Sequence, residues 1–204
     1  MNAVTQPRTV AYELHGNCYV NLTSRCTLRC AFCPKFNGQW EVQGYPLRLR
    51  GEPDVEEVLA AVGDPLRYRE VVFCGLGEPT LRLDTLLACA RRWHRQGAVV
   101  RLNTDGLASL VHGRDVTPEL GAVIDRVSIS LNAQEEGVYD RHCRPPVEGA
   151  WEAAIDFARR MRDQIDDVTL TAIDGLAGVD VEEVRRIADT LGVRFRRRVL
   201  DQVG

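Results

Sequence analysis

The sequence has no long hydrophobic run, no strong charge of either sign and no paired set of cysteines. No segment approaches the roughly 20 consecutive apolar residues of a bilayer-crossing helix. The opening stretch, MNAVTQPRTVAYELHG, lacks the apolar core of a secretion signal. The formal net charge is only −3, so no overall field draws the chain to nucleic acid or to a membrane. We therefore expect a cytoplasmic protein with neither a membrane nor a nucleic acid as its partner.

Internal repeats, low-complexity tracts and long Gly/Ser/Pro linkers are also missing, which favours a single domain. The seven cysteines are an odd number, and thiols stay reduced in the cytoplasm, which argues against a disulfide framework. Four cysteines are scattered singly, and most of these are expected to be small buried side chains: Cys18, Cys74, Cys89 and Cys143.

Short apolar runs alternate with longer helical patterns along the whole chain. Six strands are predicted, at residues 18–23, 70–75, 98–104, 126–132, 167–173 and 193–200. Helices are predicted between them, at residues 55–63, 80–97, 117–124, 149–161 and 180–192. This alternation predicts an α/β fold with a parallel sheet and right-handed crossovers. Six such units form either an incomplete barrel or an open doubly wound sheet, and the chain is short for a closed eight-unit barrel.

Unusual polar segments follow four of the predicted strands. They are CTLRCAFC (26–33), GLGEPT (75–80), NTDG (103–106) and SLNAQ (130–134). In both candidate folds, ligands bind at the carboxyl ends of the parallel strands. The four segments are therefore predicted to share one rim of the sheet.

The first of these segments gathers three thiols, Cys26, Cys30 and Cys33, into eight residues. Iron–sulfur clusters and structural zinc ions both usually take four protein ligands. Three cysteines would leave one iron of a four-iron cluster without a protein ligand and open to a substrate or cofactor. A zinc site, with Cys18, Cys74 or His15 as the fourth ligand, is the alternative.

The spacing CTLRCAFC, with an aromatic residue before the last cysteine, resembles the CxxxCxxC signature of the radical S-adenosylmethionine (radical SAM) enzymes. GLGEPT resembles the family's Gly-Gly-Glu-Pro motif, NTDG its Thr-Asn-Gly turn, and VSISLNA (127–133) its Ser-Leu-Asp strand end. The resemblance covers roughly residues 12–200. Within the family, GNCYVNLTSRCTLRCAFCPKFNG (16–38) in a short chain is most similar to the radical SAM proteins associated with TatD-type nucleases.

The resemblance implies a partial (β/α)6 barrel, an open TIM-like barrel of parallel strands with outer helices. Residues 1–204 would form a single core domain, with residues 1–17 as an N-terminal lead-in. It also implies that Cys26, Cys30 and Cys33 bind three irons of a [4Fe–4S] cluster, whose fourth iron chelates S-adenosylmethionine. Further contacts with S-adenosylmethionine are implied for Phe32, Gly77, Glu78, Thr104, Ser130 and Asn132.

Each of these contacts has a chemical reason and a structural alternative. Phe32 would lie near the adenine or simply pack the loop, whereas Gly77 and Glu78 would meet the amino group. Thr104, Ser130 and Asn132 carry small groups that suit the ribose or the carboxylate, and they also suit strand-end capping. The chain departs from the family pattern at Leu76, Asp105 and Asn132, where glycine, asparagine and aspartate are usual.

The implied reaction is reductive cleavage of S-adenosylmethionine to methionine and a 5′-deoxyadenosyl radical, which abstracts hydrogen from an unknown substrate. An electron donor such as flavodoxin or ferredoxin would be a partner. No side chain is assigned as catalytic. The alternatives are an activase that generates a radical on a partner protein, and a non-catalytic iron–sulfur or zinc module.

Two further segments bear on the substrate. YDRHCRPP (139–146) carries a thiol that could donate hydrogen or ligate a second centre, but it reads more simply as a loop that begins a helix at Pro145 and Pro146. In RFRRRVL (194–200), Arg194, Arg196 and Arg198 share one strand face. That face is either the charged edge that deters aggregation or a site for an anionic substrate. A protein is the other substrate that we expect, besides an anionic molecule.

Overall fold

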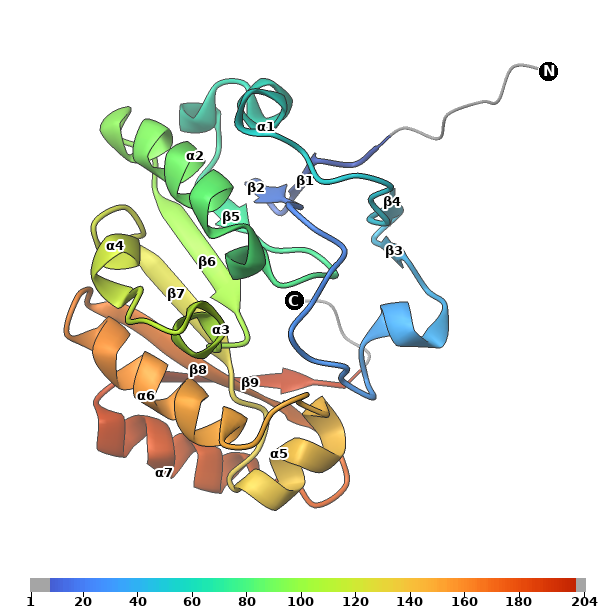
Figure 1. Ribbon diagram of the computed structural model, residues 1–204, viewed down its shortest axis with the longest axis vertical. Coiled ribbons are helices and arrows are strands. Elements are labelled where there is room, and N and C mark those ends of the chain that lie inside the picture. The colour runs from blue at the N-terminus through green and yellow to red at the C-terminus, as the bar shows by residue number, and fades with distance from the viewer. Residues whose placement is uncertain (1–7, 201–204) are drawn as a thin grey trace.

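The computed structural model describes residues 8–200, and its centre is a seven-stranded sheet (Figure 1). The strands follow one another in the sheet in chain order, β1-β2-β5-β6-β7-β8-β9. β1 pairs antiparallel with β2, and all the other pairs are parallel. A doubly wound sheet reverses its strand order at a switch point. This sheet does not, so the predicted partial barrel of six parallel strands is confirmed. The strands are β1 (Ala11–Leu14), β2 (Asn17–Val20), β5 (Val71–Phe73), β6 (Val100–Thr104), β7 (Arg126–Ser130), β8 (Asp167–Asp174) and β9 (Arg194–Val199).

The long helices line one face of this sheet, and within residues 8–200 none of them covers the opposite, concave face (Figure 1). Their ends follow local sequence signals: Asp54 forms a capping box with Glu57 at the start of α1, and Gly192 ends α7 in a left-handed conformation. The helices are α1 (Val55–Val62), α2 (Leu83–Arg95), α3 (Ala108–His112), α4 (Thr117–Gly121), α5 (Glu136–Cys143), α6 (Ala150–Arg162) and α7 (Val181–Leu191). Short 3-10 turns occupy η1 (Pro34–Asn37), η2 (Pro65–Arg67) and η3 (Pro79–Arg82).

The two faces of the sheet differ in polarity because strand side chains alternate. Val100 and Leu102 of β6 are fully buried in the core under the helices, and the ring of Phe73 lies 5.4 Å from that of Trp93 in α2. Arg101 and Asn103 of β6 point to the concave face and are only partly buried. The hydrophobic core therefore lies between the sheet and the helices, and the polar side chains lie on the concave face.

Several short elements differ from the sequence predictions. Part of the predicted lead-in is a strand, β1, while its first seven residues lie outside the described residues. A hairpin of β3 (Glu41–Val42) and β4 (Tyr45–Pro46) and the helix α3 were not predicted. Residues 80–82, predicted as helix, belong to the 3-10 turn η3.

The hairpin has a local explanation, because Gln43 and Gly44 both have positive φ, as a type I′ turn requires. None of the helices in residues 8–200 combines the length and the hydropathy needed to cross a membrane.

Candidate functional site

The three clustered cysteines lie on the loop between β2 and η1, which we call the cysteine loop (residues 21–33). Cys33 is the residue before the 3-10 turn η1, and its N–H donates to Cys30 O at 3.1 Å. Inside the loop, the Thr23 hydroxyl accepts the Arg25 N–H at 2.9 Å. The loop therefore has a defined backbone path, although it contains no regular secondary structure.

Two neighbouring segments hold the cysteine loop in place. The N–H of Glu78, after β5, donates to Arg25 O at 2.8 Å. From the other side, Arg29 N–H donates to Cys143 O at 3.1 Å, and Ala31 N–H to His142 O at 2.8 Å, at the end of α5. The loop thus bridges GLGEPT after β5, one of the segments predicted to share the rim, and the helix α5 that follows β7.

Gly77 makes the first of these contacts sterically feasible. A Cβ at this position would lie 2.1 Å from Thr23 O and 2.5 Å from Arg25 O. Only a residue without a side chain allows this approach of two backbones. The glycine predicted to approach a ligand thus approaches the cysteine loop.

The three thiols are partly buried and have raised pKa values. Burial raises the pKa of Cys26 to about 12, with Asp105 and Glu78 adding to the shift, and burial also raises the pKa of Cys33. The pKa of Cys30 is raised first by the neighbouring Cys143 thiol and then by burial. Without a metal these thiols are protonated, so binding a metal would release protons.

The arrangement gives no support to a single-ion zinc site. Within residues 8–200, no group of three or more His, Cys, Asp or Glu side chains is placed to hold one metal ion. Thiolates on one zinc ion each lie about 2.3 Å from it, and hence within roughly 4 Å of one another. A four-iron cluster spreads its cysteines over separate irons, so its ligands lie further apart.

Glu78 is the most heavily hydrogen-bonded carboxylate at this rim. It is 3% exposed. Its Oε1 accepts the Thr80 N–H at 3.0 Å, the Thr80 hydroxyl at 2.7 Å and the Thr104 hydroxyl at 2.9 Å, while Oε2 accepts the Asp105 N–H at 2.8 Å. Burial raises the pKa of Glu78, and the hydrogen bonds from Thr80, Thr104 and Asp105 oppose that rise. The predicted role of Thr104 is therefore accompanied by a structural one, because its hydroxyl positions Glu78.

Asp105 places a second buried carboxyl beside Glu78. It is 6% exposed, and its Oδ1 accepts the Leu107 N–H at 2.9 Å, but its Oδ2 is buried without a hydrogen-bond partner among the described residues. Burial first, and then the charge of Glu78, raises the pKa of Asp105 well above its ordinary value. A buried carboxylate pair with an unpartnered oxygen is unfavourable unless protons or a cation compensate it.

The third part of the rim follows β7. Asn132 has a φ of 61°, in the left-handed region that asparagine tolerates better than most residues. Its Nδ2 donates to Ser130 O at 3.3 Å and lies 3.9 Å from the Cys143 sulfur. Its Oδ1 is buried and, within residues 8–200, unpartnered. The amide oxygen is thus available to accept a hydrogen bond from a bound molecule.

Cys143 corrects one sequence interpretation. Residues 139–143 are the second half of α5, not a loop that begins a helix, and Arg144 ends α5 in a left-handed conformation. The Cys143 thiol is fully buried and lies close enough to Cys30 to raise the pKa of that thiol. Beside it, the Tyr139 hydroxyl is also buried, without a partner in the described part of the chain.

The residues present fit the cofactors that the motifs imply. Three cysteines on one loop supply thiolate ligands, and the buried Glu78–Asp105 pair matches an ammonium group. The unpartnered Asn132 oxygen and the nearby Ser130 offer polar contacts to a hydroxyl or carboxylate. Phe32 packs partly buried against the core, which is the loop-packing role given above as its structural alternative.

Sequence reasoning identified the three cysteines and Glu78 as a group but assigned no role to Asp105 or Tyr139. The signal for Asp105 was its departure from the usual asparagine in the NTDG turn. Tyr139 gave no signal, because its position depends on how α5 returns over the cysteine loop.

Comparison with known proteins gives a consistent result. A family model described as "Radical SAM superfamily" matches residues 20–191. A GTP 3',8-cyclase of Mycobacterium marinum is 30% identical over 167 residues, which are 81% of this chain and 41% of the cyclase. A probable dual-specificity RNA methyltransferase RlmN of a Synechococcus strain is 27% identical over 126 residues, 57% of this chain and 34% of that protein.

Solved structures show the same fold. TYW1 with a lysine-pyruvate adduct bound superposes with a TM-score of 0.62 at 15% identity, over 93% of this chain and 67% of that one. Native anSMEcpe with bound AdoMet superposes with a TM-score of 0.60 at 14% identity, over 89% of this chain and 50% of that one. The chain spans less than half the length of the two curated relatives described above.

Proposed function

This chain belongs to the radical SAM superfamily, and we propose that it is an enzyme that cleaves S-adenosylmethionine reductively to abstract hydrogen from a substrate. Members of the superfamily are enzymes that use a [4Fe–4S] cluster and S-adenosylmethionine. When bound, these two groups supply a one-electron reduction that breaks a carbon–sulfur bond and yields methionine and a 5′-deoxyadenosyl radical. The protein's own residues bind and orient these groups and exclude water.

We assign the cluster to Cys26, Cys30 and Cys33. Their loop is fixed on both sides by backbone hydrogen bonds, to Glu78 N–H and to the carbonyls that end α5. A fixed loop presents its thiols with little ordering cost on binding. Three ligands leave one iron free, which is the feature that S-adenosylmethionine requires.

We assign the amino group of S-adenosylmethionine to the carboxyl pair of Glu78 and Asp105. The unpartnered Asp105 Oδ2, buried beside a second carboxyl, is the observation that carries this assignment. An ammonium would supply both the missing donor and the missing positive charge. Contacts of Gly77, Thr104, Ser130, Asn132 and Phe32 with the rest of the cofactor belong to the same proposal.

An external reductant such as flavodoxin or ferredoxin would supply the electron, and we place the enzyme in the cytoplasm, where thiols stay reduced. Residues 16–38 further favour the group of radical SAM proteins associated with TatD-type nucleases. A simple electron carrier or zinc module is less favoured, because neither needs a buried carboxyl pair beside its cysteines. No feature of the described residues favours an activase over an enzyme acting on a small molecule.

The test is anaerobic reconstitution with iron and sulfide, followed by dithionite and S-adenosylmethionine. We expect 5′-deoxyadenosine to form in the wild type, to be abolished by Cys30→Ala and to persist in Cys89→Ala. Cys89 is a matched control, since it is a buried thiol in α2 and lies outside the rim. A protein that takes up zinc but no iron, and forms no 5′-deoxyadenosine, contradicts the proposal.

A further inference from the structure

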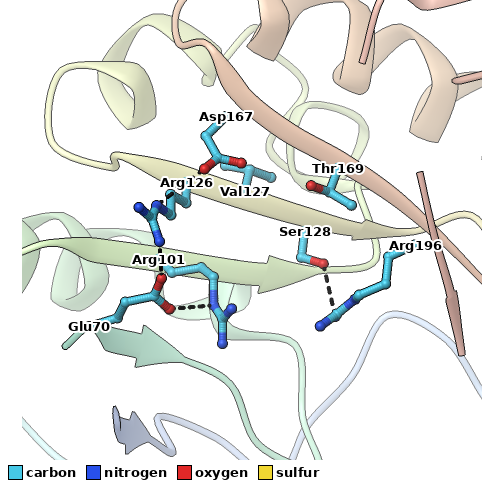
Figure 2. A pocket seen from close by; sticks show the side chains of 8 residues that line it. All are labelled: Glu70, Arg101, Arg126, Val127, Ser128, Asp167, Thr169 and Arg196. Carbon is cyan, nitrogen blue, oxygen red and sulfur yellow. Dashed lines mark hydrogen bonds and ion pairs between the residues drawn. The ribbon is translucent and has the colours of Figure 1, made fainter. Parts of the chain in front are cut away.

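The concave face of the sheet carries more positive than negative charge. Figure 2 shows Glu70 between two guanidiniums, those of Arg101 and Arg126. Asp167 forms ion pairs with Arg126 at 3.2 Å and with Arg194 at 2.6 Å. Two carboxylates thus form ion pairs with three arginines. Two more arginines of this face lie on β9.

Arg196 and Arg198 are these remaining arginines, and neither forms an ion pair within residues 8–200. Arg196 has one side-chain hydrogen bond, from Nη2 to the Ser128 hydroxyl at 3.4 Å (Figure 2). The pKa of Arg196 is lowered by burial first and then by the charges of Arg101 and Arg198. Arg101 and Arg198 therefore lie close enough to Arg196 to repel its charge. We call Arg101, Arg196 and Arg198 the arginine face.

Buried polar atoms around the arginine face have no partner among the described residues. They are Arg198 Nε, Asn103 Oδ1 and Thr171 Oγ1, and Thr171 is only 1% exposed. In the sheet register, Thr171 is the direct neighbour of Arg196, on the same face. Polar groups buried in this way are usually hydrogen-bonded, so these three atoms are available to hydrogen-bond a bound molecule.

Protection of an exposed sheet edge explains only two of the four arginines on β9. Arg197 points to the opposite face of β9 and pairs with Asp174, and Arg194 pairs with Asp167. Those two satisfied arginines suit the role of a charged edge. The inward-facing pair, Arg196 and Arg198, is not needed for that role and is left without counter-charges in the described part of the chain.

A cavity of about 210 Å³ opens beside the arginine face, between Arg101, Ser128 and Arg196 (Figure 2). Small-molecule sites usually measure about 300–1,000 Å³, so this cavity has room for an end group rather than a whole ligand. Arg198 lies two residues, or roughly 7 Å, nearer than Arg196 to the carboxyl end of β9. The cavity itself lies toward the amino ends of the strands, because Arg126 and Asp167, the first residues of β7 and β8, line it. A molecule anchored here would have to run along the concave face past Arg198 to reach the rim that carries the cysteines.

We propose that the arginine face binds the carboxylate or phosphate group of a small anionic substrate and holds the rest of that molecule at the cysteine rim. The inference rests on the proposed function, because it names the substrate class of the same enzyme. Guanidinium forks match both anions bidentately. Asn103 and Thr171 would hydrogen-bond polar groups next to the anion.

The test is equilibrium dialysis of the reconstituted protein against labelled inorganic phosphate and, separately, labelled succinate, at constant ionic strength in chloride. We expect at least one of the two anions to bind the wild type. The double variant Arg196→Gln/Arg198→Gln should bind it about ten- to a hundredfold more weakly, since charge-assisted hydrogen bonds are lost. Arg197→Gln is the matched control, because it removes the same charge from the opposite face of the same strand, and its affinity should stay within about twofold of the wild type.

A measurement on the wild type keeps the test valid if the double variant fails to fold. Phenylglyoxal modifies accessible arginines, and bound phosphate or succinate should protect Arg196 and Arg198 but not Arg197, as mapped by mass spectrometry. The inference is overturned if neither anion binds, if the double variant and Arg197→Gln bind alike, or if protection is uniform along β9.

The same preparation separates this inference from the proposed function. Wild-type protein that forms 5′-deoxyadenosine with dithionite but binds neither anion contradicts only the substrate class. Arginine-dependent anion binding in a protein that forms no 5′-deoxyadenosine supports the anion site but contradicts the proposed enzymatic function. Binding of phosphate without succinate, or the reverse, assigns the anion.

Discussion

The N–H of Asp105 donates to Oε2 of Glu78 at 2.8 Å, which joins two buried residues that follow neighbouring parallel strands. Each brings a carboxyl group to a rim where the structure supplies no basic partner among residues 8–200 for the Asp105 Oδ2 atom. Such an arrangement costs stability unless a ligand compensates it. The first two predictions follow from this cost.

Asp105→Asn should weaken S-adenosylmethionine binding by about ten- to a hundredfold, because one charge-assisted contact to the amino group is lost. The same substitution should raise the thermal stability of the cofactor-free protein, since a buried charge beside Glu78 is removed. Calorimetric titration and thermal unfolding measure the two effects. Asp189→Asn, an exposed change in α7, should alter neither. Tight binding by Asp105→Asn would remove Asp105 from the amino-group site.

The stability of the cofactor-free protein should fall as pH rises. The pKa values of Glu78 and Asp105 are raised in the folded state, so the folded protein binds more protons than the unfolded chain. Their contribution is therefore fully present below the ordinary carboxyl pKa, near 4, and is lost as pH rises through the folded values. Denaturant unfolding between pH 4.5 and 7.5 should show the gap between Asp105→Asn and the wild type widening with pH. A gap that is constant, or that narrows, contradicts this account of the carboxyl pair.

Gly77→Ala should destabilise the protein by about 2–4 kcal/mol, because the new methyl would collide with backbone oxygens that have little room to move. The substitution should also reduce iron incorporation, since it separates the cysteine loop from the segment that carries Glu78. Denaturant unfolding and iron analysis measure these effects. Gly137→Ala, in α5 with open space around it, should be neutral or slightly stabilising. Full iron content in Gly77→Ala would show that this contact does not position the thiols.

Cys143→Ala should retain the full complement of iron and sulfide after reconstitution. The Cys143 thiol lies beside Cys30 and raises its pKa, but our account assigns the cluster to the three thiols of the cysteine loop alone. Some loss of stability is expected, about 1 kcal/mol, because a buried sulfur is removed. Iron loss in Cys143→Ala comparable to that in Cys30→Ala would make Cys143 a fourth ligand and close the open iron.

The sequence was sufficient to predict the features that depend on local pattern. Strand–helix alternation predicted the parallel sheet, and the rule of strand carboxyl ends predicted that Cys30, Glu78 and Asn132 would share a rim. The spacing of the three cysteines, with the three motifs that follow, also predicted the family. All of these inferences rest on residues whose positions are fixed by the strand that precedes them.

Features that depend on the return of distant segments were beyond the sequence. The Cys30–Cys143 contact requires α5 to pack over the cysteine loop, and nothing local in residues 139–146 indicates that packing. The unequal pairing of the arginines on β9 depends on which of them meets Asp167 or Asp174 across the sheet. The sequence identified the face of Arg196 and Arg198 but gave no means of separating satisfied from unsatisfied charges.

The central claim is that one iron of a cluster bound by three cysteines is open to S-adenosylmethionine. Its most direct test is electron–nuclear double resonance on the reduced, reconstituted protein with S-adenosylmethionine labelled with ¹⁵N at the amino group and ¹⁷O at the carboxylate. We predict hyperfine coupling from both labels to the cluster in the wild type. A reduced four-iron cluster that shows no coupling to either label, with S-adenosylmethionine present at saturation, would contradict the claim.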